Sequence, residues 1–130
     1  MNWKIIMKTA KDFLNEANEN VPKIDVNEGI EKHSQSNVVF VDVRDSQDIN
    51  KTGTIAGALR IPRGMIEFFA DETHPLHNEN MKKNSQIILV CGAGGQAALA
   101  GNTLLQMGYE KVVNIGGFKD WKNAGGPSES

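Results

Sequence analysis

The stretch IILVCGAGGQAALAGNTLLQMG, residues 87–108, decides the fold class. Its first four residues are apolar, which is typical of a strand buried on both faces of a parallel sheet. After a glycine-rich turn, the run from Gln96 to Met107 places its apolar residues on one stripe, as a helix packed on a sheet does. Gly108 follows where a helix C-terminal cap is expected. A strand, a tight turn and a helix in this order predict an α/β protein.

The same alternation runs through the rest of the chain. Candidate strands lie at residues 23–25, 38–43, 58–61 and 112–115, the first of them a short edge strand. Candidate helices lie at residues 9–17, 27–32 (with Asn27 as N-cap), 64–70 and 118–123. Strands that alternate with helices predict parallel pairing and helices on both faces of the sheet.

Length and composition limit the possible classes of function. The 130 residues fit one domain, and a net charge of −2 offers no attraction for nucleic acid or an anionic membrane. No apolar run approaches the roughly 20 residues that span a bilayer, and the first residues lack the pattern of a signal peptide. We therefore expect a cytoplasmic monomer with an N-terminal helical extension at 1–20, a folded domain at 21–127 and a loose tail at 128–130.

Cys91 is the only cysteine, so it forms no disulfide within the chain and its thiol is available for chemistry. At the end of a parallel strand it lies at the edge where ligand sites form. The N–H groups of the next residues can turn inward around an anion, and the following helix adds the positive end of its dipole. This environment favours the thiolate, which is the nucleophile. A small core residue at a strand end is the other interpretation.

Two nucleotide-binding motifs overlap the same letters. Residues 92–97 match G-x-G-x-x-A, the dinucleotide fingerprint, which expects an acidic residue roughly 20 positions later at the end of the next strand. The strand at 112–115 instead runs into Gly116 and Gly117. A phosphate-binding P-loop would need a Gly-Lys-Ser/Thr sequence, which does not follow. Nucleotide binding is therefore disfavoured.

Three ordered segments resemble the rhodanese-like (sulfurtransferase) domain family. VVFVDVRDSQDINKTGTIAGALRIP (38–62) resembles the family's strand ending in Asp-x-Arg, followed by its Gly-x-Ile-x-Gly-Ala-x-x-Ile-Pro stretch, with Thr54 in place of the usual histidine. ILVCGAGGQAALAGNTLLQMGY (88–109) resembles the catalytic strand, loop and helix, and VVNIGGFKDWKNAGGP (112–127) the closing signature. Together with RGMIEF (63–68) these segments span roughly residues 38 to 127.

The resemblance implies a five-stranded, mostly parallel sheet flanked by helices on both faces. It implies a sulfurtransferase in which Cys91 takes a sulfane sulfur from a donor such as thiosulfate, holds it as a persulfide and passes it to a thiol or cyanide. No metal and no cofactor are expected. The implied partners are a small sulfur donor and a thiol acceptor, with a sulfur-carrier protein among the candidates. By the same match the substrate-binding cradle consists of Gly92, Ala93, Gly94, Gly95, Gln96 and Ala97.

The loop departs from the family pattern in its charge. Many relatives carry Arg or Lys there, whereas Gln96 brings hydrogen-bond donors but no cation. We therefore expect weak thiosulfate binding and a high KM. The phosphatase-like branch of the fold uses Cys-x5-Arg, and Ala97 stands at the arginine position, which disfavours phosphatase or arsenate reductase activity. A non-catalytic module that binds a partner or senses oxidants through Cys91 is the alternative to an enzyme.

Two arginines are further candidates for substrate binding. Arg44 is expected either to form a structural ion pair with Asp42 or to supply positive field at the pocket. Arg63 follows the short strand at 58–61 and is expected either to be solvated at the surface, the default for a charged residue, or to contact the donor. His74 and His77 lie in a polar stretch interrupted by proline, which favours an irregular loop over a metal site.

Overall fold

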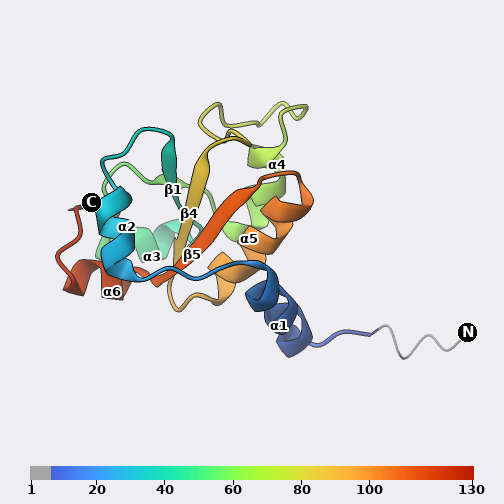
Figure 1. The fold of residues 1–130 in the computed structure, drawn as a ribbon, viewed down its shortest axis with the longest axis horizontal. Coiled ribbons are helices and arrows are strands. Elements are labelled where there is room, and N and C mark those ends of the chain that lie inside the picture. The colour runs from blue at the N-terminus through green and yellow to red at the C-terminus, as the bar shows by residue number, and fades with distance from the viewer. Residues whose placement is uncertain (1–6) are drawn as a thin grey trace, which may run out of the picture.

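The continuous apolar segments of the sequence form the parallel strands at the centre of the molecule (Figure 1). The structure is a computed structural model that describes residues 7–130. Its main sheet contains β1 (Val38–Asp42), β3 (Leu59–Arg60), β4 (Gln86–Cys91) and β5 (Lys111–Gly117) in the spatial order β3-β1-β4-β5. All three pairings are parallel, which confirms the predicted α/β class.

The sheet has four strands and not the expected five. The predicted edge strand at 23–25 contributes only a single bridge, between Lys23 and Asn114. The chain turns away after this bridge because the carboxylate of Asp25 accepts a hydrogen bond from the Asn27 backbone N–H at 3.0 Å. Asp25 is therefore the N-cap of helix α2 (Val26–Lys32), and the predicted cap, Asn27, lies inside the helix.

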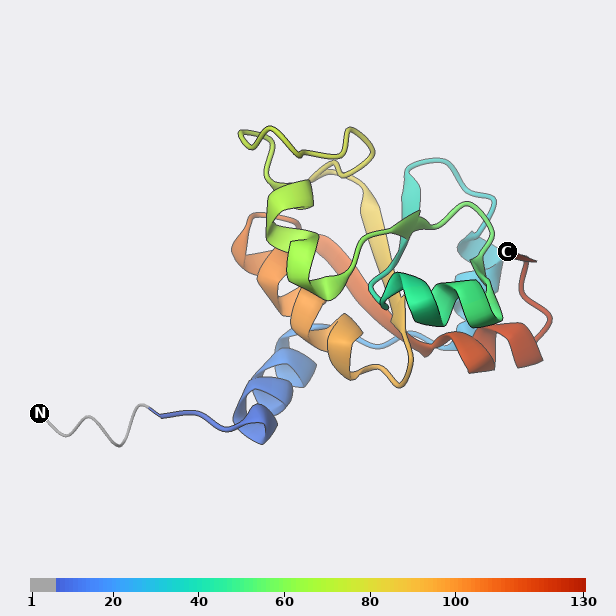
Figure 2. The same ribbon diagram turned by 180° about the vertical axis from the view of Figure 1, so that it is seen from behind.

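Helices cover both faces of the sheet. Figure 2 shows α4 (Ile66–Ala70), which follows the 3-10 turn at Arg63–Met65, and α5 (Gly95–Gln106) lying over one face. The other face carries α2 and α6 (Phe118–Asn123). Alternate residues of β4 enter the two cores, Ile87 and Leu89 on the α5 side and Ile88 and Val90 on the α6 side. Burial on both faces explains why this strand reads as an unbroken apolar run.

The N-terminal helix α1 (Ala10–Asn20) packs along α5 (Figure 1). Thr9 and Asp12 form a reciprocal capping box that starts it, and the helix continues three residues beyond the predicted end at residue 17. The Asn20 side chain donates a hydrogen bond to Asn102 of α5 at 3.0 Å. Residues 1–6 of the predicted extension lie outside the described residues. None of the helices within residues 7–130 is long and apolar enough to cross a bilayer.

Helix α3 (Ser46–Thr52) and a second, two-stranded sheet were not predicted from the sequence. That sheet pairs β2 (Thr54–Ile55) with β6 (Ser128–Glu129) in antiparallel fashion. The tail expected to be loose from residue 128 is thus paired to the segment that follows α3. The indole N–H of Trp121 also donates to the Pro127 carbonyl at 2.9 Å, which holds the chain leading to β6.

Candidate functional site

Strand β4 delivers Cys91 to the carboxyl edge of the sheet, where the chain turns sharply. Cys91 lies opposite Gly117 of β5. A side chain at position 117 would place its Cβ 2.4 Å from the Gly92 carbonyl oxygen, so only glycine allows the two backbones to approach this closely. The end of β5 therefore fixes where the loop after Cys91 begins.

The loop wraps its backbone amides around the cysteine sulfur. The N–H of Gly94 donates to Cys91 Sγ at 2.9 Å, and the N–H of Ala97 does so at 3.4 Å. Gly94 reaches this position with φ +96°, a left-handed conformation that favours glycine, and it is the N-cap of α5. The sulfur therefore lies at the positive end of a helix of 12 residues, where a negative charge is stabilised.

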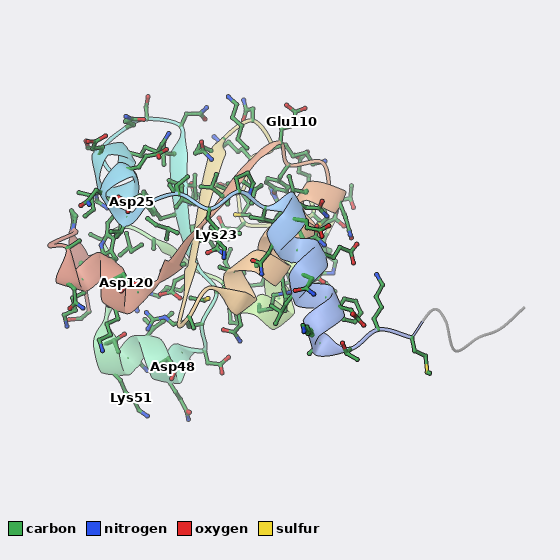
Figure 3. The ribbon with its side chains drawn as sticks, turned by 60° about the horizontal axis from the view of Figure 1, so that its bottom comes forward. Lys23, Asp25, Asp48, Lys51, Glu110 and Asp120 are labelled. Carbon is green, nitrogen blue, oxygen red and sulfur yellow. The ribbon has the colours of Figure 1, made fainter. Side chains whose placement is uncertain are left out.

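Cys91 lies beneath this loop and is only 1% exposed. Hollows open on both sides of the loop. One has a volume of about 330 Å³ and lies between α1 and Ala93–Gly95; Lys23, labelled in Figure 3, contributes its cation. The other, of about 510 Å³, lies between α3 and α6 and reaches Gly92. Cys91 itself lines neither of these two hollows.

Asn114 holds the loop from the neighbouring strand. Its side chain is buried, donates to the Gly94 carbonyl at 3.0 Å and accepts from the Gly116 N–H at 2.8 Å. Its own backbone N–H bonds to Pro22 and its carbonyl to Ile24, so the residue is fixed on every side. Sequence reasoning did not single out Asn114. Its position as a lone polar residue within a buried apolar strand was the feature of the sequence that could have identified it.

The Asp42–Arg44 pair is buried and forms part of the framework. The guanidinium donates to the Asp42 carboxylate from Nε and from Nη2, the latter at 2.7 Å, and the Thr54 hydroxyl donates to the same carboxylate. Its remaining donors bond to Thr52 Oγ1 and the Gly53 carbonyl, which fastens the end of α3 to β1. The guanidinium also lies over the Phe118 ring, 4.9 Å from its centroid. Of the two expected roles, the ion pair is present.

The predicted site residues separate into two groups. The loop residues and Arg44 come together, because Arg44 lines the same hollow as Gly92. Arg63 does not join them. Its guanidinium pairs with Glu67 at 3.1 Å and donates to Thr103, which lies eight residues along α5 from Gly95, about 12 Å at the helical rise. A donor contact from Arg63 stays a prediction that this placement does not favour.

The arrangement is suited to holding an anion on sulfur. Preorganised amides and a helix dipole stabilise charge without the rearrangement that water would need. Within residues 7–130, no group of three or more His, Cys, Asp or Glu side chains is placed to hold a metal ion. The chemical groups at the site are one thiol, the backbone N–H groups of Gly94 and Ala97 that point at it, and the cations beyond the loop.

Comparison with known proteins identifies a matching family model and solved structures that resemble this chain. A family model described as the rhodanese-like domain matches residues 25–124. A solved structure from Rhodopseudomonas palustris is 35% identical with a TM-score of 0.88, and the match covers 95% of this chain and 96% of that one. That protein is named a protein of unknown function, possible tyrosine phosphatase.

Two relatives carry names from sulfur chemistry. The thiosulfate sulfurtransferase GlpE of Tolumonas auensis is 28% identical over 66% of this chain and 74% of that protein. A putative sulfur carrier protein of Bacillus subtilis is 29% identical over 68% of this chain. The matched region spans only 43% of the Bacillus protein, so most of that relative lies outside the part that this chain resembles.

Proposed function

This chain belongs to the rhodanese-like domain family, and from that premise we propose that it transfers sulfane sulfur through Cys91. The observation that carries the proposal is the convergence of the Gly94 and Ala97 N–H groups on Cys91 Sγ. Such donors stabilise both the attacking thiolate and the persulfide anion that replaces it. Sulfurtransferase names among the relatives support the same class of reaction.

The proposed reaction has two steps. The Cys91 thiolate attacks the outer sulfur of thiosulfate, the donor S–S bond breaks, and sulfite leaves with the bonding electron pair. Cys91 now carries a persulfide. An acceptor, a thiolate or cyanide, then attacks the outer sulfur of the persulfide, and the Cys91 thiolate leaves with the electron pair of the second S–S bond. Division into two steps through an enzyme-bound intermediate predicts ping-pong kinetics.

The loop residues from Gly92 to Ala97 are proposed as the cradle, with Asn114 as a positioning residue. Asn114 does not touch the sulfur, but it holds the Gly94 carbonyl, and Gly94 donates to the sulfur. The loop contains no cation, so a dianionic donor is attracted only by amides, the helix dipole and more distant charges. We therefore propose that thiosulfate is a poor donor with a high KM.

Phosphate ester hydrolysis is the competing reaction, and the name of the Rhodopseudomonas protein is the reason to test it. The phosphatase-like branch places arginine six residues after the cysteine to hold phosphate. Here Ala97 occupies that position, fully buried in the first turn of α5. An alanine offers the phosphate no counter-charge, so sulfur transfer is the function that this loop supports better.

The decisive experiment is intact mass measured after incubation with thiosulfate. We expect a gain of one sulfur atom that disappears on adding cyanide, with thiocyanate formed in equal amount. The Cys91→Ser variant is the matched control and should gain nothing. Absence of an adduct with thiosulfate and with a low-molecular-weight persulfide would rule out the transferase and favour a binding or oxidant-sensing module. Hydrolysis of para-nitrophenyl phosphate by the wild type but not by Cys91→Ser would identify a phosphatase.

We propose that the protein works as a monomer in the cytoplasm. A single free cysteine suits a reducing compartment, in which the thiol is kept available. Small sulfur donors and thiol acceptors are the proposed substrates. A sulfur-carrier protein is a further proposed partner, and the name of the Bacillus relative supports it. Sedimentation of the purified protein tests the monomer directly.

A further inference from the structure

We infer that a lysine-rich groove beside the Cys91 loop docks an extended acidic segment of the protein that delivers or receives the sulfur. This inference rests on the proposed function for the identity of the partner, but not for the binding itself. The groove consists of the α3–α6 hollow at Gly92 and an adjoining hollow of about 360 Å³. We call these two hollows together the lysine groove.

The two parts of the lysine groove adjoin each other between the loop and β6. Its two parts share Lys51, Thr52 and Lys122, so the second begins where the first ends. The first part opens at Gly92, one residue from the sulfur, and the second reaches Ser128 in β6. Figure 3 shows Asp48 and Lys51 on α3, with α6 and its Asp120 directly alongside.

The charge of the lysine groove is strongly positive. Lys51 stands on α3, and Lys119 and Lys122 stand one turn apart on α6, all exposed. Within residues 7–130, none of the three lysines forms a salt bridge or a side-chain hydrogen bond. Arg44 adds no net charge because Asp42 neutralises it at 2.7 Å.

The acidic groups along the lysine groove do not cancel these lysines. Asp48 is the single carboxylate among the described residues that line the first part. In the second part Glu129 lies 3.4 Å from Arg60 and is therefore already paired. Among the side chains that line the groove, three unpaired ammonium groups thus face one unpaired carboxylate, and the surplus charge is complementary to an acidic ligand.

The shape of the lysine groove favours an extended chain over a small ion. Helix α3 runs for seven residues, about 10 Å at the helical rise, and the groove follows it. An extended peptide advances about 3.3 Å per residue, so three or four residues would lie along α3. The lysines stand on two separate helices at the rim and would contact successive acidic side chains.

The position of the lysine groove gives it a function in sulfur transfer. The loop itself is uncharged, so the cations lie outside the loop, at the entrance to the site, and not at the reacting sulfur. A partner held there by its charge would present its own sulfur next to Gly92. Recognition of the partner and activation of the sulfur are thereby assigned to different residues.

The test measures binding of a fluorescein-labelled hexaglutamate peptide by fluorescence anisotropy at low ionic strength, using the Cys91→Ser protein so that no sulfur chemistry intervenes. The test variant carries Lys51→Gln, Lys119→Gln and Lys122→Gln. The matched control carries Lys82→Gln, Lys83→Gln and Lys111→Gln, three exposed lysines outside the lysine groove, and has the same net charge. Circular dichroism confirms that both are folded.

We expect the groove variant to bind the peptide about tenfold more weakly, as for the loss of three exposed ion pairs, and the control to bind like the parent. Equal weakening in both variants would overturn the inference, since net charge alone would then explain binding. Sulfate is also added until its total negative charge equals that of the peptide. Displacement of the peptide under this condition would overturn the inference and indicate a small-anion site. Persulfide formation from thiosulfate is measured separately in the groove variant with Cys91 intact. If the wild type forms no persulfide while the peptide still binds, the proposed function fails and the docking inference stands.

Discussion

Replacing Gly94 with alanine separates the effect of the loop on stability from its effect on sulfur chemistry. Gly94 adopts φ +96° and donates its N–H to Cys91 Sγ at 2.9 Å. An added Cβ would meet Gly116 Cα at 3.7 Å and Asn114 Nδ2 at 3.8 Å, which are ordinary contacts. The cost of Gly94→Ala therefore comes from the backbone and not from a clash.

The expected magnitudes follow from these observations. A left-handed conformation costs a residue with a side chain about 1–2 kcal/mol, so the free energy of unfolding should fall by about that amount. Relaxation of this strain rotates the Gly94 N–H away from the sulfur. A hydrogen bond to a charged acceptor contributes about 1.5–3 kcal/mol, and losing it should destabilise the anionic sulfur and slow the observed alkylation of Cys91 about tenfold or more.

The assay pairs this variant with Gly57→Ala. Gly57 has φ +78° and open space around its would-be Cβ, so the backbone cost is similar, but it lies outside the loop. Urea unfolding gives the stability of both variants, and intact mass after timed exposure to iodoacetamide near neutral pH gives the rate of alkylation. We expect both variants to lose similar stability and only Gly94→Ala to react more slowly. An unchanged or faster reaction of Gly94→Ala would refute the idea that this amide activates the sulfur.

Three further predictions concern residues around the loop and the core. Asp42→Ala leaves the Arg44 guanidinium buried without a counter-charge and should lower the free energy of unfolding by about 3–5 kcal/mol, with partial recovery in Asp42→Ala/Arg44→Met. Asn114→Ala leaves the Gly116 N–H without its acceptor and frees the Gly94 carbonyl; urea unfolding should show a loss of about 1–3 kcal/mol, and persulfide formation should slow. Burial, with smaller contributions from Glu72 and Asp71, raises the pKa of Tyr109 from 10.0 to about 12. The folded state thus favours the protonated phenol, so its contribution to stability is complete below about pH 10 and is lost as pH rises towards about 12. Tyr109→Phe should remove that part of the alkaline decline, and phenolate absorbance reports the titration because the chain has one tyrosine.

Much of the fold could be predicted from local sequence because its central elements are locally distinctive. The strands β1, β4 and β5 are continuous apolar runs, and α5 has both an apolar stripe and Gly108 in a left-handed conformation after its end. In α3, by contrast, Ile49 is the only buried residue, so no periodic pattern marks a helix. That helix is positioned by side-chain contacts with residues outside it, among them the hydrogen bond that Arg44 donates to Thr52.

The candidate site also has one part that local sequence predicts and another that it does not. Cys91 and its glycines are consecutive in the sequence, and a strand–turn–helix pattern is enough to predict converging amides. Asn114 and the lysine groove depend on segments that meet only in the folded chain. Strands β2 and β6 have two residues each and are more than seventy positions apart in the sequence. Such short strands show no local sequence pattern from which their pairing could be predicted. In the sequence, Lys51 and Lys122 are indistinguishable from other exposed charged residues. They come together only because α3 and α6 lie side by side in the fold.

The depth of the Cys91 sulfur has a consequence for handling the protein in air. A covalent dimer would require two sulfurs at about 2.05 Å and their Cα atoms within about 7 Å. Cys91 is 1% exposed beneath its loop, so two folded copies cannot bring their sulfurs together without opening it. Ageing without reductant should therefore leave a single-chain band on a non-reducing gel, while small oxidants such as peroxide convert the thiol to sulfenic acid and beyond.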